Sequence, residues 1–549
     1  MEQFDTIVIG SGVGGLAAAI CLTRAGQRVL VLEQHYVPGG WSHSFTLNGQ
    51  RFSPGVHYVG LLEDGKSTNE LYRGLGIAND LVFFKLNPKA YEHCLINGEQ
   101  FDLPAGIENL KNTLCAKFPH ERKGIIKYLK LVENVSLELQ LMPKLKGLWQ
   151  QITVPFRTKN FGKTALFPLK KVIGWYIKDP MLKAVLNIQC GDHGLPPKTA
   201  CFPVHCSVMS HYFDGGYYPM GGGGGLVKAM TNAVKRYGGE VRVKQAVDKI
   251  IVGNNQAKGV VLKDGTKIFA KNILSNADPS TTYLDLIGKE HLGKKLQKKL
   301  AGTKYSVTSL ILFLTLDIDV TLYGVDSGNI WMMASDDLDA NFESLMNTEI
   351  TSGESFPAVF ISCTTLKDPV SFNGRYHNFE IVTYVNYDSL EKFNGLEDYH
   401  SPQYADFKQR VISKLLNNLA QVIPTVKEHV VQAELGTPKT NQFYINATRG
   451  NVYGTEKILR QVGPFSFKNK SEIENLYLCG ASTLSHGVGG ATNSGVMAAA
   501  SILQCHYEDL LVGDPDQKLR IYDADDPESW PDWVHVKRSD KVRTFKEIG

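Results

Sequence analysis

The chain has 549 residues with a formal net charge of +4 at pH 7, and 43% of its residues are hydrophobic. This length and composition allow about two to four domains around a large core, and the small net charge argues against a general nucleic-acid-binding protein. The nine cysteines form no CxxC pair and no zinc-binding spacing, so we expect free thiols of a reducing compartment and no metal site.

The first predicted elements are a strand, a glycine-rich turn, a helix and a second strand. The apolar run 6–9 leads into Gly10-Ser11-Gly12-Val13-Gly14-Gly15, a helix follows over 16–25, and the strand 28–32 ends at Glu33. Gly10 suits the sharp turn, Gly12 lets the backbone approach a pyrophosphate, and Gly15 lets the helix pack against the strand. The helix N-terminus attracts phosphates, and Glu33 can accept hydrogen bonds from a ribose. We predict a dinucleotide-binding βαβ unit rather than an ordinary tight turn, with cofactor contacts from Gly10, Gly12, Gly14, Gly15, Glu33 and Gln34.

A second glycine pair narrows the cofactor. Gly39 and Gly40 follow Glu33 after a short spacer, and a backbone without side chains can close over a ligand there. The spacing resembles the extended dinucleotide motif of FAD-dependent oxidoreductases of the amine oxidase and phytoene desaturase superfamily, which implies FAD bound in an extended conformation. Many members have a basic residue directly after the two glycines. This chain has Trp41, so that contact is not carried over.

Basic charge is concentrated in the segment 143–183, which has nine Lys and Arg residues against one acidic residue, Asp179. Tryptophan, phenylalanine and leucine residues are interleaved with these charges. Such a segment is typical of helices that lie on an anionic membrane surface, and it is also compatible with a solvated basic face over the protein's own core. We favour membrane docking, which would let the protein collect a lipophilic ligand from a bilayer, and leave the second interpretation open.

The centre of the chain has the next nucleotide-binding signals. In order, they are a glycine run, a helix, two strands and a hairpin: 221–225, 226–237, 240–243, 247–252 and 256–270. We interpret them as the return of the chain into the FAD-binding domain, with Val247 as a cofactor contact. A flexible linker is the less favoured interpretation of the glycine run, because an amphipathic helix follows it directly.

Near the C-terminus, a short apolar strand over 475–479 ends at Gly480 and Ala481, and a helix of small residues follows over 491–500. Small residues allow a flavin to approach the helix, and the dipole at the helix N-terminus favours negative charge on a reduced flavin. The predicted contacts are Gly480, Ala481, Gly489, Gly490 and Ala491.

These signals predict an α/β fold, a Rossmann-like FAD-binding domain of the superfamily type with an inserted α+β substrate domain. Strand-like runs at 309–316, 358–363 and 379–385 and a helix near 404–419 belong to the inserted part. The predicted boundaries are 1–60, 215–280 and 442–505 for the FAD-binding domain, 61–214 and 281–441 for the substrate and membrane-facing domain, and 506–549 for a C-terminal tail.

Further motifs resemble the retinol saturase family, the all-trans-retinol 13,14-reductases. They are His43-Ser44-Phe45, Gly55-Val56-His57-Tyr58-Val59-Gly60, Gly191-Asp192-His193-Gly194-Leu195-Pro196-Pro197 and His211-Tyr212-Phe213-Asp214-Gly215-Gly216-Tyr217-Tyr218-Pro219. Ser275-Asn276-Ala277-Asp278-Pro279 is shared more widely with carotenoid isomerases and phytoene desaturases.

The resemblance implies that FAD saturates one double bond of a lipophilic conjugated polyene, with NAD(P)H as a candidate external electron donor. A proton donor or alcohol-binding group should project into an apolar tunnel, and we expect His57 or Tyr58 near the flavin ring. The full set of catalytic candidates is His57, Tyr58, His211, Tyr212 and Tyr218. A carotenoid cis–trans isomerase, a desaturase and a flavin-containing retinoid-binding protein remain as alternatives.

The N-terminus has no recognisable signal or transit peptide before the first strand. No stretch reaches the about 18 apolar residues that span a bilayer. The sequence therefore predicts a cytoplasmic protein whose membrane contact is at most peripheral.

Overall fold

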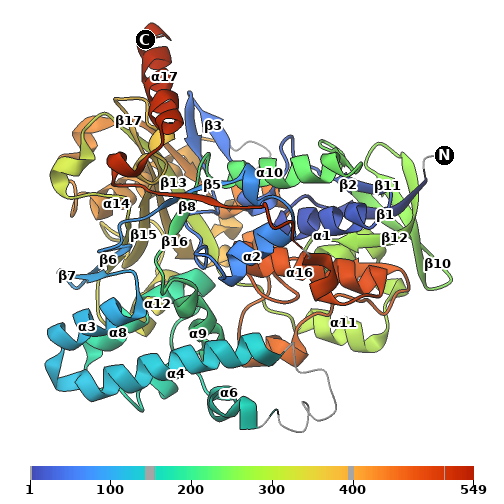
Figure 1. Ribbon diagram of the computed structural model, residues 1–549, viewed down its shortest axis with the longest axis horizontal. Helices are drawn as coiled ribbons and strands as arrows, with labels where there is room; N and C mark the ends of the chain where they lie inside the picture. The colour runs from blue at the N-terminus through green and yellow to red at the C-terminus, as the bar shows by residue number, and fades with distance from the viewer. Residues whose placement is uncertain (1–2, 143–153, 155, 394–400, 512, 549) are drawn as a thin grey trace.

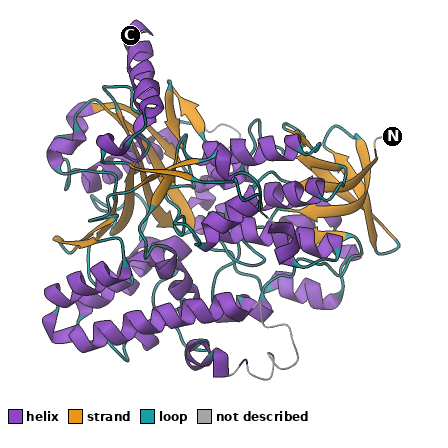
Figure 2. Cartoon of the chain, in the orientation of Figure 1, coloured by secondary structure: helices purple, strands orange, loops and turns teal. Residues whose placement is uncertain are grey.

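The structure, a computed structural model, describes residues 3–142, 154, 156–393, 401–511 and 513–548. Two large sheets lie on opposite sides of the molecule, and a layer of helices lies below them in the view of Figure 1. Figure 2 shows that the right-hand sheet has helices against it, whereas the left-hand sheet curves toward the lower helical layer.

The first sheet contains the N-terminal glycine motif. Its order is β10-β11-β12-β1-β2-β9, with β18 on the free end of β12, and the strands are β1 (Gln3–Ile9), β2 (Val29–Leu32), β9 (Glu240–Arg242), β10 (Val247–Gly253), β11 (Gln256–Leu262), β12 (Lys267–Ser275) and β18 (Leu476–Leu478). The pairs around β1, β2, β9, β12 and β18 are parallel, whereas β10 and β11 form an antiparallel extension. Because parallel strands point the same way, their carboxyl ends meet at one edge, where ligands of open α/β sheets bind.

Three helices cover this sheet: α1 (Val13–Arg24), α10 (Gly223–Arg236) and α16 (Gly487–Leu503). The small side chains of α1, among them Ala17, Ala18 and Ala19, are fully buried. They allow α1 to lie between the sheet and α16 at close range, which the contacts between the two helices show.

The second sheet has the order β17-β13-β16-β15-β14-β6-β7. Its strands are β6 (Glu92–Ile96), β7 (Glu99–Leu103), β13 (Thr308–Leu316), β14 (Asn329–Met333), β15 (Ala358–Cys363), β16 (His377–Val385) and β17 (Val430–Gly436). All nine residues of β13 are buried, as expected for an uninterrupted apolar run in a central strand. The helices α12 (Leu338–Asn347), α13 (Thr364–Lys367) and α14 (Pro402–Leu419) contact this sheet.

The remaining elements complete the lower helical layer and the edges. The helices are α2 (Ser67–Gly74), α3 (Ile107–Lys117), α4 (Arg122–Leu141), α6 (Lys159–Thr164), α7 (Leu169–Ile173), α8 (Pro180–Leu186), α9 (Phe202–His211), α11 (Lys294–Ala301), α15 (Pro438–Ile445) and α17 (Asp532–Ile548). The strands β5 (Val82–Lys85), β8 (Tyr217–Pro219) and β19 (Arg520–Asp523) form a small sheet, and β3 (Phe45–Leu47) pairs with β4 (Gln50–Phe52). No helix in the described part of the chain is long and apolar enough to cross a bilayer.

The predicted fold class is confirmed, and one detail of the glycine run differs from the prediction. Gly223, Gly224 and Gly225 form the first turn of α10 instead of preceding it. A Cβ atom on Gly223 would lie 2.4 Å from the Ser42 carbonyl oxygen, and one on Gly225 would lie 2.1 Å from that of Met220. Close packing, which requires residues without side chains, therefore explains the run.

Candidate active site

The N-terminal glycine turn has the tight geometry that the sequence predicts. Gly10 adopts φ +90°, a conformation that favours glycine. A Cβ on Gly15 would lie 2.3 Å from the Gly10 carbonyl oxygen, so the first turn of α1 packs directly on the loop. Gly12 precedes α1, and no side chain caps the helix there. The free backbone N–H groups of this turn can therefore bind an anionic ligand.

Glu33 fixes this loop from the end of β2. Its Oε2 accepts hydrogen bonds from the Ser11 N–H at 2.9 Å and the Ser11 hydroxyl at 2.6 Å, and its Oε1 accepts one from the His35 N–H at 2.9 Å. The same Ser11 hydroxyl accepts a hydrogen bond from the Gly39 N–H at 3.0 Å. A Cβ on Gly40 would meet the Gly12 Cα at 3.3 Å. The two glycine motifs thus pack on each other through Ser11.

The third glycine segment meets the N-terminal glycine turn at Asn276, a residue that sequence reasoning did not assign to the site. The Asn276 N–H donates to the Ile9 carbonyl oxygen at 2.8 Å, just before the glycine turn. Its amide group would contact a Cβ on Gly12 at 2.6 Å and a Cβ on Gly480 at 3.0 Å. The motif 275–279 was the available signal, but the motif alone does not show that its asparagine faces both glycine segments.

The beginning of α16 leaves space for a ligand. A Cβ on Gly489 would have no neighbour nearer than the Thr68 hydroxyl oxygen at 3.9 Å, whereas one on Gly495, further along α16, would lie 1.9 Å from the Gly14 carbonyl oxygen. The helix is therefore tightly packed on α1 in its middle and open at its first turn. Together with the uncapped start of α1 and the buried Glu33, this cradle fits FAD, and the predicted cofactor residues of all three glycine segments would hold it.

The remaining predicted cofactor residues lie at the margins of this region. Gln34 is directed to a different segment, and its Nε2 is 3.5 Å from the Tyr444 carbonyl oxygen. Val247 begins β10, pairs with Leu262 and is partly buried. Ala481 accepts a hydrogen bond from Lys457 through its carbonyl oxygen at 2.7 Å.

Two of the predicted catalytic residues are hydrogen-bonded to carboxylates that lie far away in the sequence. His57 Nδ1 is 2.9 Å from Oε2 of Glu380, a fully buried residue in the middle of β16. The Tyr58 hydroxyl donates to Asp192 Oδ2 at 2.7 Å, and its ring stacks on Tyr212 with centroids 4.1 Å apart. The structure thus brings the segment 55–60 against the motif 191–197.

His211 and Tyr218 have different surroundings from this pair. His211 Nε2 accepts a hydrogen bond from the Gly60 N–H at 2.8 Å, and burial lowers the pKa of His211 to about 4. An unprotonated ring nitrogen at this position supports the segment 55–60. Tyr218 is almost completely buried, and burial raises its pKa well above the usual value.

Three ionisable residues at this place were missed by sequence reasoning: Glu92 and Lys367, which are fully buried, and Asp192, which is partly exposed. Burial raises the pKa of Glu92 to about 7 and that of Asp192 to about 8, and it lowers the pKa of Lys367 to about 8. Lys367 Nζ donates to the His57 carbonyl oxygen at 2.9 Å, and the Trp331 indole N–H donates to Glu92 Oε2 at 2.9 Å. Buried ionisable groups with such shifted pKa values are concentrated at functional sites.

A largely apolar pocket adjoins this cluster. It lies between β14, β15 and β16, the helix α12 and the motif 191–197, and its lining includes Gly191, Pro197, Trp331, Phe360 and Tyr384. The Tyr384 hydroxyl donates to the Gly191 carbonyl oxygen at 2.6 Å. The inner wall of the pocket therefore contains the neighbours of Asp192 and Glu92.

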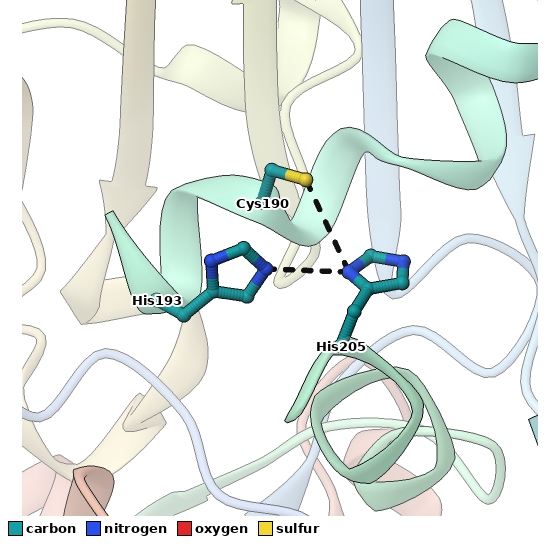
Figure 3. Close-up of side chains that lie close together, drawn as sticks. All are labelled: Cys190, His193 and His205. Carbon is teal, nitrogen blue, oxygen red and sulfur yellow. Dashed lines mark hydrogen bonds between the residues drawn. The ribbon is translucent and has the colours of Figure 1, made fainter. Parts of the chain in front are cut away.

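The structure also brings Cys190, His193 and His205 together (Figure 3), although the sequence predicts no metal site. His205 Nε2 is 3.3 Å from the Leu186 carbonyl oxygen, so this nitrogen carries the hydrogen, and His205 Nδ1 accepts from His193 Nε2 at 3.3 Å. Burial lowers the pKa of both imidazoles, to about 4 for His205. Two neutral, hydrogen-bonded rings thus join the 3-10 helix η5 (Ile188–His193) to α9 and fix the position of Asp192 within η5.

Known proteins with related sequences agree with this geometry. Residues 13–503 match the family described as flavin containing amine oxidoreductase. All-trans-retinol 13,14-reductase of Homo sapiens is 29% identical over 540 residues, which cover 93% of this chain and 87% of that protein. Prolycopene isomerase 2 of an Oncidium hybrid cultivar is 28% identical over 513 residues, which cover 91% of this chain and 83% of that protein.

An oxidoreductase structure from Methanosarcina mazei has the same fold, with a TM-score of 0.60 at 16% identity, covering 91% of this chain and 100% of that chain. The predicted superfamily and the FAD-dependent oxidoreductase class are therefore confirmed. The chain belongs to the flavin-containing amine oxidoreductase family.

Proposed function

We propose that this protein saturates one carbon–carbon double bond of a lipophilic conjugated polyene of the retinoid class. The observation that carries the proposal is the apolar pocket whose inner wall, at Gly191 and Trp331, meets buried acidic groups. A polyene has almost no hydrogen-bonding groups, so an apolar lining with few polar contacts suits it. The likeness to retinol 13,14-reductases supports the same substrate class.

Bound FAD, once reduced, supplies the hydride for this reaction. The chain's own residues have the other tasks: the glycine segments with Glu33 bind and orient the cofactor, and the pocket excludes water. We assign His57, Tyr58, His211, Tyr212 and Tyr218 to the proposed reaction site beside the pocket, where His57 and Tyr58 would lie near bound flavin. In this proposal His211 supports the segment 55–60 rather than donating a proton, because its ring nitrogen is already an acceptor.

The proposed domain division follows the sheets. The strands of the first sheet come from 1–60, 215–280 and 442–505, which form the proposed FAD-binding domain. Those of the second sheet come from 61–214 and 281–441, the proposed substrate domain.

Product mass decides between this function and its alternatives. Reduced holoenzyme is incubated anaerobically with all-trans-retinol or with a carotene, and the products are analysed by mass spectrometry. A gain of two hydrogens supports the reductase, and a loss of two indicates a desaturase. An unchanged mass with a shifted retention time indicates an isomerase, which the likeness to prolycopene isomerase favours as the second candidate. Tight binding without turnover indicates a retinoid-binding protein. Bleaching of the flavin absorbance by NAD(P)H tests the proposed external donor.

We also propose that the basic segment docks on an anionic membrane surface. Residues 143–153 and 155 lie outside the described part of the chain, and the argument rests on the residues that follow. Phe156 is 81% exposed, Leu166 is 79% exposed and Trp175 is 44% exposed, and lysines flank them. Large exposed apolar side chains between basic groups fit an interface with anionic lipid.

The position of α7 connects this surface with the pocket. The Lys170 N–H donates to the carbonyl oxygen of Pro197, a pocket residue, at 2.8 Å, and Lys170 Nζ is 2.8 Å from Asp339 Oδ2 on α12. A lipophilic ligand leaving a bilayer at this surface would reach the pocket after a short path. The double change Phe156→Ser and Leu166→Ser should weaken binding to vesicles that contain phosphatidylserine. The control Leu322→Ser, at a residue 80% exposed elsewhere, should not. Equal sedimentation of both variants would contradict the proposal.

A further inference from the structure

Asp192 lies where the pocket, the start of α16 and the segment 55–60 meet. Its carbonyl oxygen accepts a hydrogen bond from Nε2 of His486, the residue directly before α16, at 2.9 Å. Its side-chain Oδ2 accepts one from the Tyr58 hydroxyl at 2.7 Å. Its neighbours Cys190 and Gly191 line the pocket. Asp192 therefore links the apolar pocket with the cofactor segment that begins at α16.

The hydrogen bonds of Asp192 leave one carboxyl oxygen free. Oδ2 is occupied by the Tyr58 hydroxyl, whereas Oδ1 has no hydrogen-bond partner among the described residues. The residue is partly exposed. A proton on Oδ1 could therefore be presented to a bound substrate, while Tyr58 holds the carboxyl plane in place.

The charges around Asp192 disfavour its ionised form. Glu92 faces it from β6, and its negative charge raises the pKa of Asp192 in addition to burial. Lys367 on α13 is the nearby cation, but its ammonium group donates to the carbonyl oxygens of His57 and Asn329 and not to Asp192. The other titratable groups facing Asp192 are the neutral phenols of Tyr58, Tyr91, Tyr212, Tyr384 and Tyr453, the Cys190 thiol, whose pKa is raised by burial, and the His486 imidazole, whose pKa is lowered by burial.

We propose that Asp192 is the proton donor for saturation of the double bond and that Tyr58 is its positioning residue. This inference rests on the proposed function. With two-electron-reduced FAD bound, the π bond would break as one carbon gained a hydride from the cofactor, which would be oxidised, and the other carbon gained the proton of Asp192 as its O–H bond broke. The resulting carboxylate is stabilised by the Tyr58 hydroxyl and by the charge of Lys367, and it regains a proton from water before the next turnover.

The first test is a single turnover of reduced holoenzyme in deuterated water. Because the N5–H of a reduced flavin exchanges with solvent, the wild-type product should contain deuterium at both carbons of the former double bond. Asp192→Asn is nearly isosteric but cannot transfer a proton, so the turnover rate should fall by about 10²- to 10⁴-fold. Its FAD content and its Kd for the polyene should stay within about twofold of wild type. Asp192→Asn turning over at the wild-type rate overturns the inference while leaving the proposed function intact.

A second measurement does not depend on turnover. At pH 7 the infrared spectrum of the wild-type holoenzyme should contain the C=O stretching band of a protonated carboxylic acid, and Asp192→Asn should lose it. If the wild-type enzyme saturates no polyene, the proposed function fails, and this band still decides whether Asp192 keeps a proton. If the wild-type spectrum has no carboxylic acid band that disappears in the spectrum of Asp192→Asn, the inference is overturned.

The pH profile separates the two roles. A general acid is active when protonated, so the wild-type rate should fall as pH rises past about 8, the pKa of Asp192. Tyr58→Phe removes a hydrogen bond to the carboxylate, which raises the pKa of Asp192 and should move the fall in rate to higher pH. Glu92→Gln removes a negative neighbour, which lowers the pKa of Asp192 and should move the fall in rate to lower pH. The control Tyr72→Phe, a fully buried tyrosine of α2, should leave the fall in rate in place. Shifts of the same sign in the first two variants contradict the assignment.

Discussion

The change Gly489→Ala separates the fold of the glycine segments from their role in binding FAD. A methyl group there would have its nearest neighbour at 3.9 Å, an ordinary contact distance, so the cofactor-free protein has room for it. Alanine is favoured over glycine within a helix by about 1 kcal/mol, so the stability of the cofactor-free protein should stay the same or rise slightly. If the flavin lies against the first turn of α16, the same methyl group occupies space that the cofactor needs.

The cost to FAD binding can be worked out from packing. Inserting a methyl group into a filled contact costs about 1–3 kcal/mol, which corresponds to a Kd increase of about 5- to 150-fold. The assay is titration of the cofactor-free protein with FAD, monitored by flavin fluorescence, together with thermal unfolding of the same samples. We expect the Kd to rise while the unfolding temperature of the cofactor-free protein is maintained.

Two matched glycines serve as controls for this prediction. Gly495→Ala should lower the stability of the cofactor-free protein by about 3 kcal/mol or more, because its methyl group would lie 1.9 Å from the Gly14 carbonyl oxygen and would push α16 away from α1. Gly162→Ala on α6, where no atom lies within 4 Å of the added Cβ, should leave FAD affinity unchanged and raise stability by at most about 1 kcal/mol. Wild-type affinity of Gly489→Ala for FAD would refute the placement of the cofactor at this turn.

Three further changes test single contacts. Glu33→Gln places an amide N–H against the N–H and hydroxyl donors of Ser11 or the N–H of His35. We therefore expect a loss of about 1–3 kcal/mol in unfolding free energy and weaker FAD binding. An unchanged denaturant midpoint would contradict this expectation. His211→Phe leaves the Gly60 N–H without an acceptor and should cost about 1–3 kcal/mol by urea unfolding, whereas His211→Gln should recover part of it. Because the folded-state pKa of Asp192 is raised from 3.8 to about 8, its contribution to stability is complete at low pH and is lost as pH rises toward 8. Asp192→Asn should therefore gain in unfolding temperature relative to wild type between pH 5 and pH 8, and a constant difference would show that the carboxyl is already ionised at pH 5.

The cofactor half of the molecule could be predicted from the sequence because its signals are local. Gly10, Gly15 and Glu33 lie within one βαβ unit, and each has a role that its neighbours in the sequence define. The alternation of strands and helices around 226–275 is likewise a short-range pattern. Asn276 was not assigned because its importance depends on two glycine segments that meet only in the folded chain.

The acidic half of the site could not be predicted in the same way. Tyr58 and Asp192 are 134 residues apart, and His57 and Glu380 are 323 residues apart. Lys367 follows two threonines and a leucine and precedes an aspartate, a context typical of an exposed turn, yet it is completely buried. One signal was available: Glu380 is the single charged residue inside the apolar strand 379–385, and a charge on a buried strand requires a partner.

The apolar pocket and the proton of Asp192 depend on each other. A carboxyl group keeps its proton at neutral pH only where its ionised form is poorly stabilised, and here burial and the negative charge of Glu92 raise the pKa of Asp192. The same burial makes the pocket suitable for a polyene and unsuitable for a charged amine, the substrate type that the family name suggests. An ammonium group entering this pocket would pair with Asp192 or Glu92 and remove the acid that the reduction needs. The choice of substrate and the supply of the proton thus follow from one physical feature, the low polarity around Asp192. Phe360→Asn on the pocket wall makes both the pocket and the surroundings of Asp192 more polar. This single change should therefore reduce polyene affinity and lower the pH at which activity is lost.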